Sequence, residues 1–163
     1  MARIRAEQPL VPSVLDRLLD DDPDVNREAP KTRHQVLRDL KQAVRRDLEN
    51  LLNTRRRCRG WPAGLKELEK SLVNYGIPDF TGARMSTAED RDDFRRALET
   101  VLRTYESRFK SVKVLLLENT DESDRTLRFR IDGLLVADPA PEPVVFDSAL
   151  EPTTGGFQVK GVS

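Results

Sequence analysis

Carboxylates are the most abundant residues in this sequence that could do chemistry. A glycoside hydrolase needs two of them about 5 to 9 Å apart, one held in its protonated form. Glu106, between an apolar helical pattern and an apolar run, is the first candidate, with Asp79 or Asp132 as a conceivable second. Arg108 follows two residues later and favours an ionised Glu106, the wrong state for a general acid. With only 6% aromatic residues to stack on sugar rings, we predict no catalysis.

Other catalytic and metal-binding chemistries lack their residues. The chain has one histidine, His34, and one cysteine, Cys58, which cannot form a zinc site of ordinary composition or an internal disulfide. Arginines flank Cys58 and would make it somewhat reactive if exposed, but no histidine is placed to make it a nucleophile. Neither a G-x-S-x-G elbow nor a phosphate-binding glycine loop is present. We expect no catalytic residue, no metal and no cofactor.

The charges balance, with 28 Lys plus Arg against 28 Asp plus Glu. A net charge of zero argues against a protein whose main role is to bind nucleic acid. The run from Arg55 to Arg59, with four arginines, leaves a nucleic-acid adaptor as a minor alternative. No apolar run approaches the ~20 residues of a membrane span, and the first residues lack the apolar core of a signal peptide. We therefore expect a cytoplasmic protein in a reducing compartment, with no membrane span.

The elements around Glu106 are the best marked in the sequence. Ser86 can cap a helix with Glu89 returning the bond, and an apolar face then recurs from Phe94 to Tyr105. The run from Val112 to Leu117 has the composition of a strand buried on both faces, so we predict a central strand. A charge pair at this junction is either a local salt bridge or a partner-binding pair.

Three further helices are predicted. Pro12 and Ser13 open a short one that must dock on its own domain or on a partner. Thr32, with Gln35, caps a long one of about five turns. A third, short helix with an apolar side from Leu65 to Val73 ends at Gly76.

The carboxyl-terminal third is strand-like. Residues 127–131 alternate in polarity, and a bulge at Gly133 would rephase the residues that follow. A proline-rich connection over 138–143 leads to strands at 144–146 and 157–159. We predict an α+β fold, in which the helices pack on one face of a small, mainly antiparallel sheet. Residues 1–30 would form an amino-terminal segment, and residues 31–163 the main domain.

Three stretches carry a family resemblance. Tyr105-Glu106-Ser107-Arg108-Phe109 resembles the Glu-Pro-Arg signature of the baseplate wedge proteins of contractile phage tails, a family historically labelled lysozyme-like. The segments 12–18 and 71–80 resemble the amino-terminal and central motifs of its type VI secretion branch, the TssE subunits. Ser107 replaces the proline of the signature, which loosens the backbone between the two charges.

The resemblance implies a structural baseplate subunit without catalysis. It implies that Glu106 and Arg108, with Tyr105 and Phe109 beside them, bind the other wedge subunits, TssF and TssG. It also implies a platform for the sheath proteins TssB and TssC, which would add a strand to an edge of the sheet. We expect that edge in the last strands, at Val145 or Val159, because they are short and close to the terminus. A cell-wall muramidase and a nucleic-acid adaptor are the alternatives, and neighbouring sheath and spike genes would exclude both.

Overall fold

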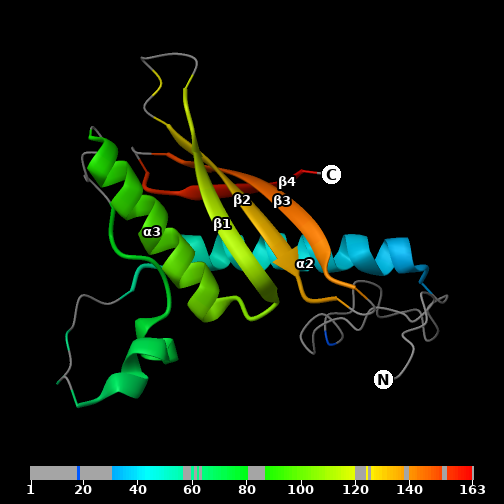
Figure 1. The fold of residues 1–163 in the computed structure, drawn as a ribbon, viewed down its shortest axis with the longest axis horizontal. Helices are drawn as coiled ribbons and strands as arrows, with labels where there is room; N and C mark the ends of the chain where they lie inside the picture. Colours follow the sequence, from blue (N-terminus) through cyan, green and yellow to red (C-terminus); the bar gives the residue numbers. More distant parts are fainter. Residues whose placement is uncertain are drawn as a thin grey trace.

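The structure is a computed structural model. It describes residues 18, 31–56, 60, 62, 64–80, 87–119, 124, 126–137, 140–151 and 154–162. The helices are α2 (Arg33–Asn53) and α3 (Ala88–Tyr105), with two short 3-10 turns, η1 (Lys66–Lys70) and η2 (Leu72–Asn74), between them. The strands are β1 (Phe109–Leu117), β2 (Leu127–Leu135), β3 (Glu142–Leu150) and β4 (Phe157–Val162). In Figure 1 the strands pass in front of α2, with α3 to their left.

Both long helices begin with a capping box. Thr32 accepts from the backbone N–H of Gln35, whose side chain returns a bond to the Thr32 backbone, as predicted. In α3 the same exchange joins Thr87 and Asp90, one residue later than the sequence indicates, and Ser86 lies outside the described residues.

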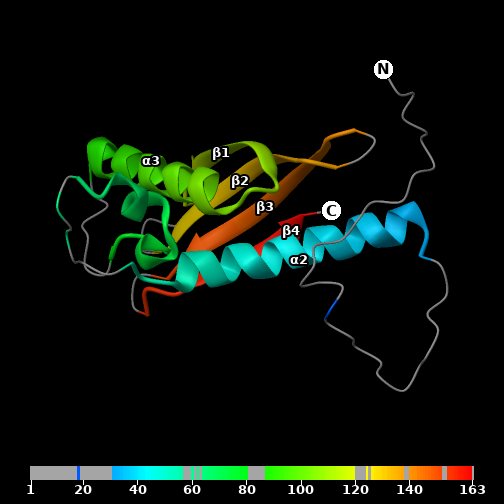
Figure 2. The same cartoon turned by 90° about the horizontal axis from the view of Figure 1, so that it is seen from below.

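The strands form one antiparallel sheet in the order β1-β2-β3-β4. Alternate side chains of all four strands join the buried faces of α2 and α3 in a single core, centred on Phe94, Phe129, Ile131 and Phe146. Figure 2 shows α2 running alongside the sheet on the β4 side and α3 on the β1 side. The predicted α+β class is confirmed, with the sheet in the carboxyl-terminal part of the chain.

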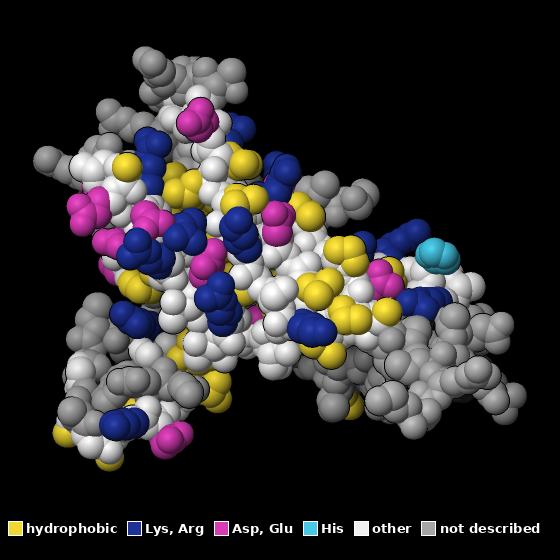
Figure 3. All heavy atoms as spheres, viewed as in Figure 1, with side chains coloured by type: hydrophobic (Ala, Val, Ile, Leu, Met, Phe, Trp, Pro, Cys, Tyr) yellow, Lys and Arg dark blue, Asp and Glu magenta, His cyan; other side chains and the backbone are white. Residues whose placement is uncertain are grey.

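The prediction that residues 112–117 form a central strand is wrong, because β1 lies at one edge of the sheet. Val112 and Val114 are buried in the core, whereas Leu115 is half-buried and Leu117 is 38% exposed on the opposite face. That face carries other half-buried apolar residues, among them Leu134 and Val145. Figure 3 shows hydrophobic side chains lying among Lys and Arg side chains on this side of the molecule. The continuous apolar run therefore reflects a partly apolar outer face.

The predicted third helix is replaced by the two 3-10 turns, and its expected apolar side does not pack. Leu65, Leu72 and Val73 are 51%, 84% and 55% exposed. The predicted end of the segment is confirmed, since Gly76 has a positive φ of 109°. The next residue, Ile77, is fully buried and forms a bridge with Arg55 beyond the end of α2.

The bulge expected at Gly133 is also wrong. Gly133 pairs in regular register with Val112 on one side and Val144 on the other, and the irregularity lies on β1, between Phe109 and Ser111. A Cβ on Gly133 would collide with the ring of Phe109. This glycine therefore makes room for an aromatic ring and does not rephase the strand.

Some predictions fall outside the described residues. They include Arg57, Cys58 and Arg59 and all of the expected amino-terminal helix except Leu18, whose side chain is 75% exposed. Within the described ranges, no helix is both long enough and apolar enough to cross a membrane.

Candidate partner-binding site

The site begins where α3 ends. Glu106 is the C-cap of α3, and its backbone N–H donates to the Leu102 carbonyl at 3.0 Å. The chain then turns, because the Phe109 N–H donates back to the Glu106 carbonyl at 3.2 Å. Oε1 of Glu106 accepts from the Arg108 backbone N–H at 3.1 Å. The turn is therefore held by three hydrogen bonds even though Ser107 replaces the proline of the signature.

The charge pair extends to a third residue that the sequence did not indicate, Asp47 of α2. Arg108 donates through Nε to Oε1 of Glu106 at 2.7 Å and through Nη2 to Oε2 at 2.6 Å, a bidentate pair. Nη2 also donates to Oδ2 of Asp47 at 2.7 Å. Burial disfavours the charged guanidinium, but the hydrogen bonds and attraction of Glu106 and Asp47 outweigh it and raise the pKa of Arg108 above its ordinary value. The pair therefore ties α2 to the junction of α3 and β1.

Tyr105 and Phe109, the other predicted site residues, pack locally. The Tyr105 hydroxyl donates to the Ser71 carbonyl at 3.3 Å, and its ring meets Tyr75 edge-on, with the centroids 5.3 Å apart. Phe109 is half-buried over Gly133. The structure thus places all four residues at the junction of α3 and β1. Each of them also contacts other residues of the same domain.

This arrangement is poorly suited to acid catalysis. Glu106 is 7% exposed, and both of its carboxylate oxygens accept from Arg108. Asp79, on the loop after η2, lies 3.7 Å from Arg55, and Asp132 is on β2. The described residues contain no group of His, Cys, Asp and Glu side chains that could hold a metal ion.

The two sheet edges decide where a strand could be added. The expectation that Val145 lies on an edge is wrong, because β3 is paired with β2 on one side and β4 on the other. Val159 does lie on the edge strand β4, but α2 bonds the outward-facing backbone there. Asn53 donates to the Phe157 carbonyl and accepts from its N–H, both at 2.9 Å, and Arg45 donates to the Val159 carbonyl at 3.1 Å.

The β1 edge is bonded over only part of its length. Glu99 of α3, 8% exposed, accepts from the Val114 N–H at 3.0 Å, and Arg103 donates to the Val112 carbonyl at 3.2 Å. In the described part of the chain, nothing bonds the outward-facing N–H and C=O of Leu116.

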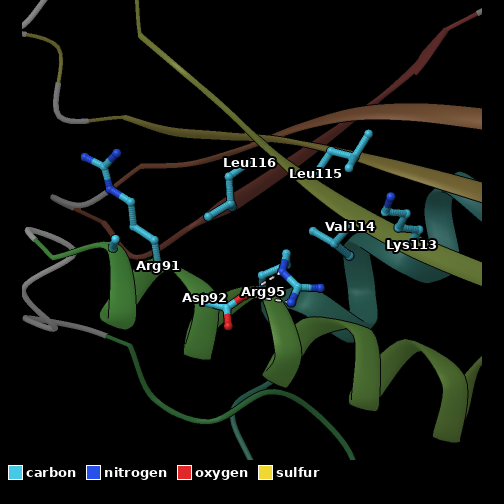
Figure 4. Close-up of a pocket in the computed structure, with 8 residues that line it drawn as sticks. Arg91, Asp92, Arg95, Lys113, Val114, Leu115 and Leu116 are labelled. Carbon is cyan, nitrogen blue, oxygen red and sulfur yellow. Dashed lines mark hydrogen bonds and ion pairs between the residues drawn. The ribbon is translucent and has the colours of Figure 1, made fainter.

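An open groove with a volume of about 470 Å³ lies beside this end of β1. Figure 4 shows its two walls: α3 contributes Arg91, Asp92 and Arg95, and β1 contributes residues 113–116. The groove therefore borders the part of the edge that α3 leaves without hydrogen-bond partners.

The basic run after α2 is only partly described, and its first member, Arg55, is half-buried. Arg55 donates to the carbonyls of Leu52 and Gly155, and its guanidinium lies 5.8 Å from the centroid of the Phe157 ring. Arg55 therefore joins α2 to the β3–β4 hairpin, and its hydrogen bonds are made within the domain.

Sequence reasoning missed the residues that bond the edges and the junction. Glu99 offered one signal, because it lies next to the buried face of α3 with an arginine four residues away on each side, Arg95 and Arg103. Asp47 and Asn53 offered none, since polar residues on a long helix are usually solvated.

Comparison with known protein families identifies a match for most of the described domain. The family described as baseplate wedge protein gp25 matches residues 38–140, more than half of the chain. The chain belongs to the baseplate wedge protein gp25 family. The match spans most of α2, all of α3, β1 and β2, and the Glu106–Arg108 pair with its partner Asp47. As a gp25 family member the chain has a structural role in a phage-tail-like baseplate. The chain matches no curated protein.

Proposed function

We propose that this gp25 family member is a TssE-type subunit of a type VI secretion baseplate, acting in the cytoplasm. It would bind the wedge subunits TssF and TssG and form the platform on which the sheath proteins TssB and TssC assemble. The family match carries the proposal, and the motifs at residues 12–18 and 71–80 favour the type VI branch.

We place wedge binding at the junction of α3 and β1, around Glu106, Arg108, Tyr105 and Phe109. The side chain of Arg108 is 20% exposed, and its Nη1 atom has no partner among the described residues. Two carboxylates fix the orientation of the guanidinium, so its outer edge is a pre-organised donor for an acidic or carbonyl group of a partner. An arginine held in this way loses little conformational entropy when it binds.

We place sheath docking by strand addition at the carboxyl-terminal end of β1, near Leu116, and no longer at the β4 edge that contains Val159. The Leu116 backbone offers an outward-facing donor and acceptor, and the adjacent groove has room for the side chains of an added strand. An added strand at β4 would first have to displace Asn53 and Arg45, which already bond that edge.

Proline substitution at the two edges tests this proposal. Leu116→Pro removes the outward-facing N–H of β1 and hinders a neighbouring strand, and Val159→Pro is the matched change on β4. In cells lacking the chromosomal gene, labelled sheaths should form with Val159→Pro and not with Leu116→Pro, while both variants still pull down TssF and TssG. Normal sheaths with a folded Leu116→Pro variant would exclude docking at β1.

A further inference from the structure

Helix side chains take the place of a neighbouring strand at both edges of the sheet. A residue on an antiparallel strand exchanges an N–H and a C=O bond with its partner. Asn53 supplies both bonds to Phe157 on β4. On β1, Glu99 bonds the N–H of Val114 and Arg103 bonds the C=O of Val112.

The β1 contact is a built arrangement. Oε1 of Glu99 also accepts from Arg95 at 3.1 Å, and Oε2 accepts from Arg103 at 3.3 Å. These arginines lie one helical turn before and after Glu99, so they hold the buried carboxylate over the strand. We call Glu99 and Arg103 the β1 clamp.

Without the clamp, β1 would be an edge strand whose backbone N–H and C=O groups face outward at three alternate apolar residues, Val112, Val114 and Leu116. Such an edge is a template for pairing with another chain, and natural proteins cover it. A second copy of this chain could pair with this edge. Two β1 strands related by a two-fold axis are antiparallel, so each offers its outward-facing N–H and C=O groups to the same groups of the other.

We propose that the β1 clamp, by bonding the Val114 N–H and the Val112 C=O, prevents two copies of this chain from pairing through β1 and leaves the Leu116 end open. The clamp would also limit how much of β1 is open to an incoming sheath strand, and this second role rests on the proposed function. Release of the clamp lengthens the edge that an incoming strand can use.

Amide hydrogen exchange of the full-length chain tests the clamp without any substitution. Val114 and Leu116 both direct their backbone N–H groups away from β2, and of the two only the Val114 N–H has a side-chain acceptor in the described part of the chain. We expect the Val114 amide to exchange at least about tenfold more slowly than that of Leu116, as loss of one hydrogen bond implies. Equal exchange of the two amides would overturn the proposal.

Substitution of Glu99 tests the consequence for self-association. In Glu99→Ala, at concentrations where the variant is monomeric, Val114 should exchange as fast as Leu116. At higher concentrations the mass measured by light scattering should rise toward that of a dimer, and both amides should become protected by pairing of the two β1 strands. Glu99→Gln keeps an oxygen acceptor and should stay monomeric. A folded Glu99→Ala variant that remains monomeric at every concentration would contradict the proposal.

Arg103→Ala covers the case in which Glu99→Ala fails to fold, because the Arg103 side chain is 62% exposed and leaves no cavity. It should speed exchange at Val114 several-fold, whereas Arg96→Ala, at a 67% exposed side chain bonded to Asp92, should not. Unchanged exchange in Arg103→Ala would count against the clamp. None of these readouts involves wedge or sheath proteins, so their failure would leave the proposed function standing.

Discussion

Nη2 of Arg108 lies 2.7 Å from Oδ2 of Asp47, which joins the turn after α3 to the carboxyl-terminal half of α2. This contact gives the signature arginine a role in the fold as well as any role in binding. The sequence alone predicts a cost near 1 kcal/mol when the charge pair is removed, as for exposed ion pairs. The geometry predicts more, because Glu106 is 7% exposed and would lose its partner.

We therefore predict that Arg108→Ala lowers the free energy of unfolding by about 2 to 3 kcal/mol, and Asp47→Ala by about 1 kcal/mol. Asp39→Ala, also on α2, is the control, since its ion pair with Lys31 is exposed and its loss should cost under about 0.5 kcal/mol. Urea denaturation measures all three. Equal, small costs for Arg108→Ala and Asp39→Ala would show that the pair contributes nothing to stability.

Ser107→Pro should stabilise the protein. Ser107 is exposed at the second position of the turn from Glu106 to Phe109, where proline is favoured. Glu106, which would precede the proline, has a ψ of 85°, outside the α-helical region that a following proline disfavours, and no described residue in the chain other than glycine has a positive φ. Proline would restrict the unfolded chain and raise the free energy of unfolding by about 0.4 to 1 kcal/mol. A lower melting temperature for Ser107→Pro than for the unmodified protein would mean that this turn cannot accept the residue of the signature.

Gly133→Ala should destabilise the sheet, because the added methyl group would collide with the ring of Phe109. We expect a loss of about 1 to 3 kcal/mol in thermal or urea unfolding. Gly64→Ala is the matched control, since a Cβ there meets no atom within 4 Å. If Phe109→Leu fails to relieve the cost of Gly133→Ala, the collision is not its cause.

Both tyrosines of the chain should titrate above their ordinary pKa. Burial raises the pKa of Tyr75, with further increases from Asp47 and Glu106, and burial raises that of Tyr105 against a smaller opposing effect of Arg56. Ultraviolet titration of the folded protein should therefore have a higher midpoint than that of the urea-unfolded chain, which should lie near 10.

The same shifts set the sign of the alkaline stability change. The unfolded chain releases its phenolic protons at lower pH than the folded protein, so this contribution to stability is full below about pH 10. This contribution to stability is lost as the pH rises through the pKa values of the tyrosines in the folded protein. Tyr75→Phe should therefore make the free energy of unfolding less dependent on pH in the alkaline range. Identical titration curves for folded and unfolded protein would refute the shifts.

Local patterns predicted most of the elements, and long-range contacts account for what they missed. The helix cap at Thr32 and the alternation of polar and apolar residues along 127–131 depend on residues close in the sequence, so both could be predicted from it. The edge position of β1 depends on strand order, which an apolar run cannot reveal. Asn53 meets Phe157 across 104 residues, and no periodicity marks such a contact.

The candidate site divides in the same way. Glu106 and Arg108 were predicted because they form a recognisable motif at a change of backbone conformation. Their partner Asp47 lies on another helix, and its place depends on how α2 packs against the junction. The 3-10 turns that replace the third helix also show tertiary contacts overriding an apolar pattern, since Ile77 is buried while Leu72 is exposed.

Native mass spectrometry of this chain co-expressed with TssF and TssG tests the central claim most directly. We predict one complex containing all three proteins, formed by the unmodified chain and lost in Arg108→Lys, which keeps the charge but not the bidentate geometry. Circular dichroism would first establish that the variant is folded. The result that would contradict the account is an unmodified, folded chain that is found only as free protein in the presence of both wedge subunits.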